Sequence, residues 1–166
     1  MGTTTLHTWF YRMMGYIPWS VLYRVRGESM APAFQGGQYV VAKPLSRSRK
    51  WLRRGDVVVL SRPAGEPERD LKRVIGLPEE YIFLDDGQVY INDRLLPEDY
   101  LAGGEAPIRN HPRRWITGPE EYFVLGDNRG DSRDSSTYGP VHQDEILARI
   151  WFRCWPPAGW GRVRNP

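Results

Sequence analysis

The stretch LKRVIGLPEEYIFLDDGQVYI, residues 71–91, decides the fold. Its first part is a short apolar run that ends at Gly76-Leu77-Pro78, which is typical of a buried strand followed by a turn. Its second part places two apolar runs on either side of Asp85-Asp86-Gly87, and an Asp-Gly step in this position favours a β-hairpin. The stretch therefore predicts three consecutive strands.

Similar short apolar runs, bounded by Gly, Pro, Asn or Asp, recur along the chain after residue 25. The predicted strands are residues 39–42, 56–60, 71–75, 81–84, 88–91, 94–96, 121–125 and 145–155. Residues 97–114 are rich in Pro, Gly and charge, which predicts a surface loop. Many short strands joined by such turns predict an all-β fold, a barrel-like arrangement of antiparallel sheets.

The 166 residues fit one domain preceded by a short segment of different character. Residues 26–166 form the predicted β-rich domain, and residues 1–25 a predicted membrane-associated segment that is hydrophobic and in part helical. Its apolar stretch, residues 13–23, is shorter than the roughly 20 residues of a spanning helix, and no small-residue cleavage site follows. Two interpretations stay open: an interfacial anchor, or a short span extended by snorkelling arginines.

The charged and polar residues narrow the possible partners. The net charge is only +3, and the basic cluster at residues 47–54 is either a solvated loop or a contact with anionic lipid. No nucleic-acid recognition motif accompanies it, so we expect no nucleic-acid partner. The single Cys154 excludes an internal disulfide and is expected to pack as a small hydrophobic residue. No Cys and His cluster has metal-ligand spacing, so neither metal nor cofactor is expected.

The scarcity of lysine draws attention to Lys72. Of the 23 basic residues 20 are Arg, which cannot lose a proton, and only three are Lys. Burial lowers the pKa of a lysine, so an amine in the apolar strand 71–75 can serve as a base. Neighbouring strand residues point to opposite faces, so Lys72 can enter an active site while Arg73 forms a salt bridge.

Ser29 is a candidate nucleophile for that base. It precedes Pro32 where a strand ends and a turn begins, which leaves its hydroxyl accessible and its backbone N–H free to bind an oxyanion. A third segment, residues 125–139, is a dense polar loop with three glycines. This loop is either an ordinary Asx/Gly turn region or the remaining part of a catalytic site.

Taken together, four segments resemble the type I signal peptidase family, whose members use a Ser/Lys dyad. The segments are Ser29-Met30-Ala31-Pro32, Gly55-Asp56-Val57-Val58, residues 72–78 and residues 126–135, in the family's order. A closing Trp155-Pro156-Pro157 is also common in such proteins. The resemblance covers residues 26–157, which is most of the chain.

The resemblance implies a role for each matching residue. Ser29 is the expected nucleophile, whose N–H forms part of the oxyanion hole, and Lys72 is the expected base. Ser132 is expected to hydrogen-bond the Lys72 amine, and Met30 to pack near the dyad and the substrate pocket. Structural support of the site is expected from Arg73, Asp127, Asn128 and Asp134.

The resemblance also implies a substrate and a location. The expected substrates are secretory preproteins, cut after an Ala-x-Ala-like stretch that binds extended as an added β-strand. The expected location is the cell membrane, with the catalytic domain on the extracytoplasmic side and in contact with membrane lipid.

The sequence departs from the family pattern at three places. Gly27 stands where some members have a serine that completes the oxyanion hole. Ser136 replaces an arginine, so Asp134 loses a salt bridge unless Arg133 or Arg73 takes that role. Glu79-Glu80 replaces Gly-Asp, which is expected to alter only a turn.

Two alternative functions stay open. The first is a self-cleaving Ser/Lys protease of the repressor type, although residues 1–25 are too short and too aromatic for its DNA-binding domain. The second is a β-barrel that binds peptide without cutting it, against which the presence of Ser29, Lys72 and Ser132 argues.

Overall fold

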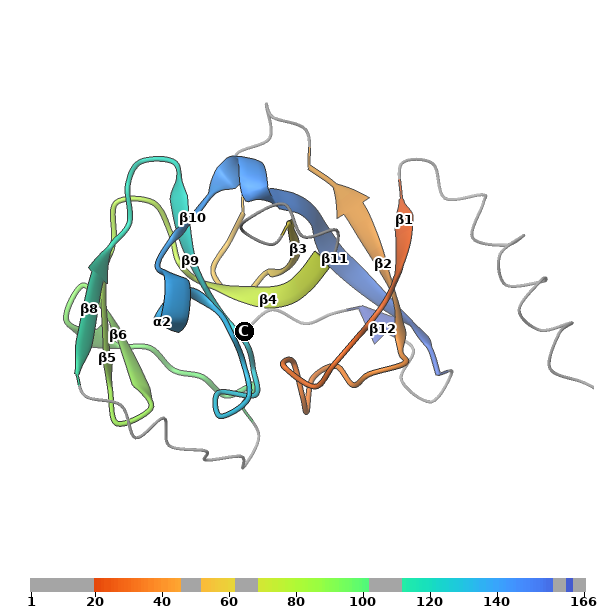
Figure 1. The fold of residues 1–166 in the computed structure, drawn as a ribbon, viewed down its shortest axis with the longest axis horizontal. Coiled ribbons are helices and arrows are strands. Elements are labelled where there is room, and N and C mark those ends of the chain that lie inside the picture. Colours follow the sequence, from red (N-terminus) through yellow and green to blue (C-terminus); the bar gives the residue numbers. More distant parts are fainter. Residues whose placement is uncertain (1–19, 46–51, 62–68, 102–111, 157–160, 163–166) are drawn as a thin grey trace, which may run out of the picture.

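The computed structural model describes residues 20–45, 52–61, 69–101, 112–156 and 161–162. These residues form two antiparallel sheets that lie toward opposite ends of the molecule (Figure 1). The all-β prediction is therefore confirmed. Residues 1–19, most of the predicted membrane-associated segment, and residues 46–51 of the basic cluster lie outside the described residues. Within the described residues, no helix is both long and apolar enough to cross a membrane.

The large sheet contains eight strands in the order β1-β2-β11-β3-β4-β9-β10, with β12 paired to β11. Their bounds are β1 (Val21–Arg24), β2 (Tyr39–Pro44), β3 (Val57–Ser61), β4 (Arg69–Gly76), β9 (Glu121–Leu125), β10 (Val141–His142), β11 (Ile146–Trp155) and β12 (Gly161–Arg162). The long strand β11 runs between β2 and β3, and its register shifts in both pairings. Such bulges bend a strand, which lets β11 serve two neighbours.

The small sheet contains four strands in the order β7-β6-β5-β8. Their bounds are β5 (Tyr81–Asp85), β6 (Gln88–Ile91), β7 (Arg94–Leu95) and β8 (Arg113–Ile116). The predicted hairpin is present as β5 and β6, and Asp86 and Gly87 both have positive φ, as a tight type I′ turn requires.

Three apolar clusters form the core, and successive side chains of β3 enter two of them: Val57 and Val59 lie in one, and Val58 and Leu60 in another. One cluster fills the space between β5, β6 and β9, and includes Ile82 and Phe123. Gly76 ends β4 at this point, where the chain leaves the large sheet for the small one. A Cβ at residue 76 would lie 2.8 Å from Phe123 Cβ, so only glycine allows this close approach.

The structure differs from the predictions in several places, and the two-residue strands β10 and β12 are among the elements that were not predicted. β1 pairs with β2, which puts residues 21–24 in the sheet rather than in the preceding segment. β8 begins at Arg113, so the predicted loop 97–114 is wrong at its end; Arg113 and Arg114 are exposed and give no apolar signal there. Two short helices, α2 (Ser135–Tyr138) and η1 (Gln143–Glu145), were not predicted.

Candidate active site

Ser29 and Lys72 lie in hydrogen-bonding contact. Lys72 Nζ is 3.1 Å from Ser29 Oγ, although 43 residues separate the two along the chain. Lys72 belongs to β4 and is only 2% exposed, and Ser29 lies in the loop that follows β1 and is half-buried. The structure thus brings together the two residues predicted as base and nucleophile.

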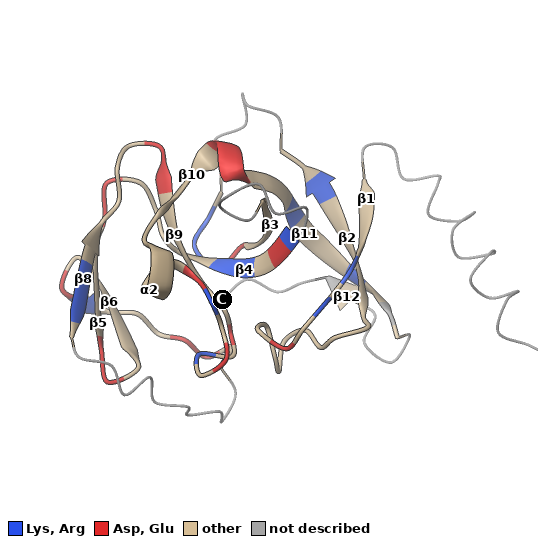
Figure 2. Ribbon diagram, in the orientation of Figure 1, with Lys and Arg blue, Asp and Glu red and all other residues tan. Residues whose placement is uncertain are grey.

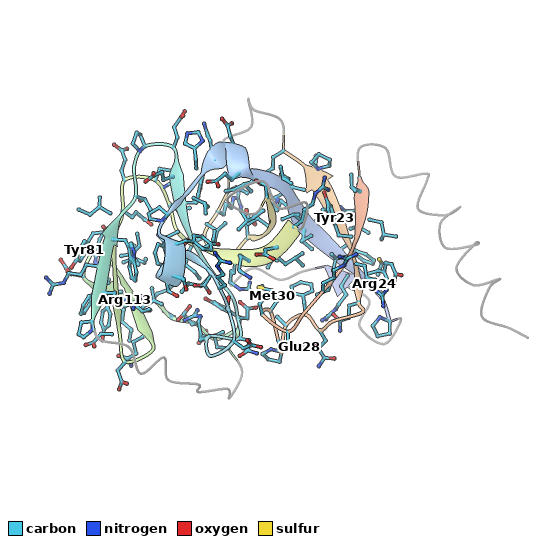
Figure 3. The ribbon with its side chains drawn as sticks, viewed as in Figure 1. Tyr23, Arg24, Glu28, Met30, Tyr81 and Arg113 are labelled. Carbon is cyan, nitrogen blue, oxygen red and sulfur yellow. The ribbon has the colours of Figure 1, made fainter. Side chains whose placement is uncertain are left out.

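The loop that carries Ser29 is fixed at its base and by an apolar anchor. Val25 N donates to Gln38 O and Gly37 N donates to Val25 O, which closes residues 25–38 into a compact loop. Met30 is 1% exposed and packs in the core cluster of β1, β2, β3 and β11. Figure 3 shows Met30 near the centre of the view and Glu28 below it, both away from the small sheet. Because Met30 is anchored, its neighbour Ser29 is held in place.

Arg73, the next residue of β4, contacts a different partner from Lys72. Arg73 Nε and Nη2 donate to the two carboxylate oxygens of Asp127, at 2.8 and 2.5 Å, and Arg73 Nη1 donates to Gly55 O. Both side chains of this pair are almost fully buried, at 2% and 1% exposed. As predicted, Arg73 forms a salt bridge while its neighbour Lys72 contacts Ser29. Figure 2 shows basic and acidic segments side by side along β4.

Asn128 connects the polar loop after β9 to the Ser29 loop. Its backbone N–H donates to Ser29 O at 3.0 Å, and its side-chain Nδ2 donates to Glu28 O at 3.2 Å. Two hydrogen bonds from one residue thus hold the main chain on both sides of the Glu28–Ser29 peptide bond. Asp127 and Asn128, both predicted as supporting residues, contact opposite halves of the dyad region.

Ser132 lies beside the dyad but does not make the predicted hydrogen bond. Its Oγ is buried and has no hydrogen-bond partner among the described residues, so the bond to the Lys72 amine is not present. A Cβ placed on Gly126 would lie 2.2 Å from Ser132 Oγ and 2.5 Å from Ser29 O. Because Gly126 has no side chain, Ser132 and the Ser29 main chain can both lie close to it.

Asp134 bonds to Ser136 itself, the residue that replaces the family's arginine. Its carboxylate accepts hydrogen bonds from Gly126 N at 2.8 Å, from Ser136 N at 3.1 Å and from Ser136 Oγ at 2.8 Å. The last two contacts cap the first turn of α2. Ser136 thus supplies two donors itself, and within the described part of the chain neither Arg133 nor Arg73 bonds to Asp134.

Glu80 has a larger role than the predicted change of a turn. Its carboxylate accepts from Arg54 Nη1 and Nη2 at 3.0 and 2.6 Å, and from Leu77 N at 2.7 Å. Arg54 also bonds Ile75 O. Glu80 therefore fastens the start of the small sheet to the end of β4.

The sequence reasoning missed three polar residues behind the site: Glu98, Tyr100 and Arg129. Arg129 is 8% exposed and forms a bidentate pair with Glu98, and Tyr100 OH also bonds Glu98. Burial raises the pKa of Tyr100 well above its usual range, and the negative charge of Glu98 adds to the shift. Burial by itself lowers the pKa of Arg129, but the hydrogen bond and charge of Glu98 outweigh it and raise that pKa. Glu98 and Tyr100 fall in the segment predicted as a loop, where only an acid and an aromatic residue in close succession gave a signal.

The described side chains offer a nucleophile and a base in contact, supported by buried charged pairs. No group of three or more His, Cys, Asp or Glu residues among them is arranged to hold a metal ion. A hydroxyl next to a buried amine is suited to attack on a carbonyl carbon, because the amine in its neutral form can accept the hydroxyl proton.

The comparisons with known proteins point to one family. Residues 3–155 match the family described as signal peptidase, peptidase S26. The chain is 30% identical over 160 residues to a signal peptidase IB of Staphylococcus aureus (strain N315), which covers 87% of this chain and 82% of that protein. It is also 30% identical over 142 residues to a probable signal peptidase I-2 of Synechocystis sp., with 80% and 62% covered.

A solved structure is similar as well. The crystal structure of a signal peptidase I from Enterococcus faecalis V583 superposes with a TM-score of 0.53 and is 33% identical in sequence. The similarity covers 61% of this chain and 98% of that one.

Proposed function

The chain belongs to the signal peptidase family, peptidase S26, and we propose that it removes signal peptides with Ser29 and Lys72 as its catalytic dyad. As a signal peptidase I it is a serine endopeptidase, a hydrolase that processes secretory preproteins.

The assignment of Ser29 and Lys72 as a dyad rests on the distance of 3.1 Å between Lys72 Nζ and Ser29 Oγ and on the burial of Lys72, which is 2% exposed. Burial disfavours the charged ammonium, so the amine is available as a base. Lys72 takes the proton of Ser29 as Oγ attacks the scissile carbonyl carbon, and the Ser29 N–H stabilises the resulting oxyanion. Collapse breaks the C–N bond, and Lys72 passes the proton to the leaving amine.

The second half of the reaction uses the same two residues. Lys72, again neutral, takes a proton from a water molecule that attacks the acyl-enzyme ester. The ester bond to Oγ breaks, the proton returns to Ser29, and the signal peptide leaves as a carboxylic acid, which gives its proton to water. One base thus serves both halves of the cycle, as in other serine hydrolases.

Strand edges near the dyad support binding of the substrate as an added β-strand. Among the described strands, β1 pairs with β2 along one edge only, and β9 pairs with β4 only from Arg73 onward. We therefore propose that an extended peptide adds as a strand beside the first half of β4, next to Lys72. Val25, Met30 and Leu71 lie in one apolar cluster next to the dyad, which suits the small apolar residues of an Ala-x-Ala site.

The proposed location is the membrane surface. Signal peptidases of this family are membrane-associated, with the catalytic domain on the extracytoplasmic side. We extend this arrangement to the present chain, with membrane lipid as a partner of residues 1–25 and of the basic cluster at residues 47–54.

The test is cleavage of a purified preprotein with an Ala-x-Ala site by the wild type and by Ser29→Ala, with the product ends identified by mass spectrometry. We expect the wild type to cut after the second Ala and Ser29→Ala to leave the preprotein intact. The rate should fall toward acid pH as Lys72 is protonated. Cleavage by Ser29→Ala at the wild-type rate would refute the proposal, and a single cut confined to the enzyme's own chain would favour the self-cleaving alternative.

A further inference from the structure

We propose that Glu98 is a positioning residue for the nucleophile. Through Arg129 it holds the loop of residues 126–129, and Asn128 of that loop fixes the main chain of Ser29. The proposal rests on the proposed function, in which Ser29 is the nucleophile, but it assigns a role to a segment outside the family motifs.

Arg129 is the first link. Its Nε donates to Gly126 O at 3.0 Å, which folds the side chain back on its own loop. Its Nη1 donates to Glu98 Oε2 at 3.0 Å and its Nη2 donates to Glu98 Oε1, so the pair is bidentate. The two side chains are only 4% and 10% exposed. A buried bidentate pair of this kind fixes direction as well as distance.

Tyr100 is the second link, and it joins Glu98 to the interior side of β4. Tyr100 OH donates to Glu98 Oε1, and Arg129 Nη2 lies 3.3 Å from the same hydroxyl. The Tyr100 ring lies under the Arg73 guanidinium, 4.1 Å from centroid to Cζ, a cation–π contact. Residues 98–100 therefore contact both buried arginines, and the charges of the two arginines are balanced by Glu98 and Asp127.

The third link leads from the loop to the dyad. Asp127 binds Arg73, the neighbour of Lys72, and Asn128 N donates to Ser29 O. A shift of this loop would therefore change the position of Ser29 relative to Lys72. Removal of the Glu98 charge leaves Arg129 buried without its carboxylate, and an uncompensated buried charge is strongly unfavourable. The loop would then move to expose Arg129. None of the contacts of Glu98 in the described structure involves Ser29 or Lys72, so it acts through the loop.

The segment that provides Glu98 directly follows β7 of the small sheet. The small sheet thus presents residues 98–100 to the back of the active site. This gives the small sheet a part in catalysis although none of the dyad residues belongs to it.

The chain offers a matched control in the pair of Arg54 and Glu80. This pair is also bidentate, and through the bond from Arg54 to Ile75 O it joins β4 to the start of the small sheet, with side chains 27% and 15% exposed. It has no contact with the loop of residues 126–129 in the described structure. Glu80→Gln therefore removes a comparable carboxylate charge while the support of Asn128 stays in place.

The experiment compares full-length wild type, Glu98→Gln and Glu80→Gln by two measurements. The first is kcat and KM for preprotein cleavage well below the melting temperature of each variant. The second is hydrogen exchange of the Asn128 amide by NMR, which reports the bond to Ser29 O directly. For Glu98→Gln we expect kcat to fall about 10- to 100-fold with KM within about twofold, because misplacement of a reacting group acts on kcat. We also expect faster exchange at Asn128. Glu80→Gln should leave both values unchanged.

The outcomes separate this proposal from the proposed function. Unchanged kcat and unchanged Asn128 exchange in Glu98→Gln would overturn the positioning role, as would an equal loss in Glu80→Gln. If the wild type did not cleave preproteins, the proposed function would fail, and the Asn128 exchange would still decide the role of Glu98. If Glu98→Gln did not fold, Tyr100→Phe removes one hydrogen bond to Glu98 and keeps the ring. That variant should lower kcat about two- to fivefold, because it removes one hydrogen bond to Glu98 and leaves the bidentate pair with Arg129 in place, and no change in kcat would overturn the proposal.

Discussion

The two sides of β4 carry neighbouring basic residues that are equally buried yet have different partners. Lys72 and Arg73 are each 2% exposed. Arg73 binds both oxygens of the Asp127 carboxylate, whereas Lys72 Nζ contacts the hydroxyl of Ser29. Burial alone therefore does not decide what a basic side chain does. A guanidinium held by a carboxylate is a fixed structural charge, whereas an amine next to a hydroxyl can exchange a proton with it.

The largest expected effect comes from substitutions that remove the proton-accepting amine of Lys72. Lys72→Arg keeps a basic side chain that cannot lose its proton, and Lys72→Ala removes the base. Both should lower the cleavage rate at least about 10³-fold, measured with a preprotein substrate. Lys72→Ala with full activity would show that the two sides of β4 do not differ as described.

The Arg73 side should respond in stability as well as in activity. Arg73→Met leaves the Asp127 carboxylate buried without its partner, which should cost about 3–5 kcal/mol in the free energy of unfolding. Urea denaturation measures this loss. Lys72→Met serves as the control on the other side of the strand and should cost clearly less. An equal cost for both variants would contradict the structural role assigned to Arg73.

Gly126 tests whether the two sides are coupled through the loop after β9. In Gly126→Ala the new Cβ would overlap Ser132 Oγ and Ser29 O, at 2.2 and 2.5 Å, so both must move. We expect kcat to fall about 100-fold, because the nucleophile is displaced. Gly161→Ala is the control, since a Cβ there has no atom within 4 Å. Wild-type kcat in Gly126→Ala would show that the loop does not position Ser29.

The smallest expected effect is the contribution of Tyr100, on the Arg73 side of β4, to the pH dependence of stability. Burial and Glu98 raise the pKa of Tyr100, so the folded state favours the neutral phenol. This contribution to stability is complete below pH of about 10, the usual tyrosine pKa, and is lost as the pH rises above it. Unfolding titrations between pH 8 and 11 should show a smaller loss for Tyr100→Phe than for the wild type. Tyr138, whose pKa burial also raises, keeps part of the slope in both proteins. An identical slope would contradict this assignment.

The sequence predicted the elements whose signals are local. The hairpin of β5 and β6 follows from its apolar runs and its Asp-Gly turn. The different partners of Lys72 and Arg73 follow from the alternation of side chains along a strand. The contact of Ser29 with Lys72 was expected from the family resemblance, and the structure contains it.

The elements that were missed depend on contacts between distant segments. β8 is a strand because it pairs with β5, although Arg113 and Arg114 are exposed and polar. The Glu98 side chain is only 10% exposed because Arg129, 31 residues later, folds onto it. Neither fact leaves a pattern in the neighbouring sequence. The two hydrogen bonds from Ser136 to Asp134 were missed for another reason, because a family pattern suggested arginine as the natural partner of that carboxylate.

The position of β11 has a consequence for the order of events during synthesis. β2 and β3 are neighbours along the chain, but in the sheet β11 lies between them and pairs with both. Until residues 146–155 have left the ribosome, no described strand joins the β1–β2 pair to the β3–β4 pair, so the strand that carries Lys72 is not yet connected through the sheet to the strand that precedes the Ser29 loop. A nascent chain that already contains Ser29, Lys72 and Ser132 should therefore be inactive. The order of the strands in the sheet thus delays activity until β11 has been synthesised.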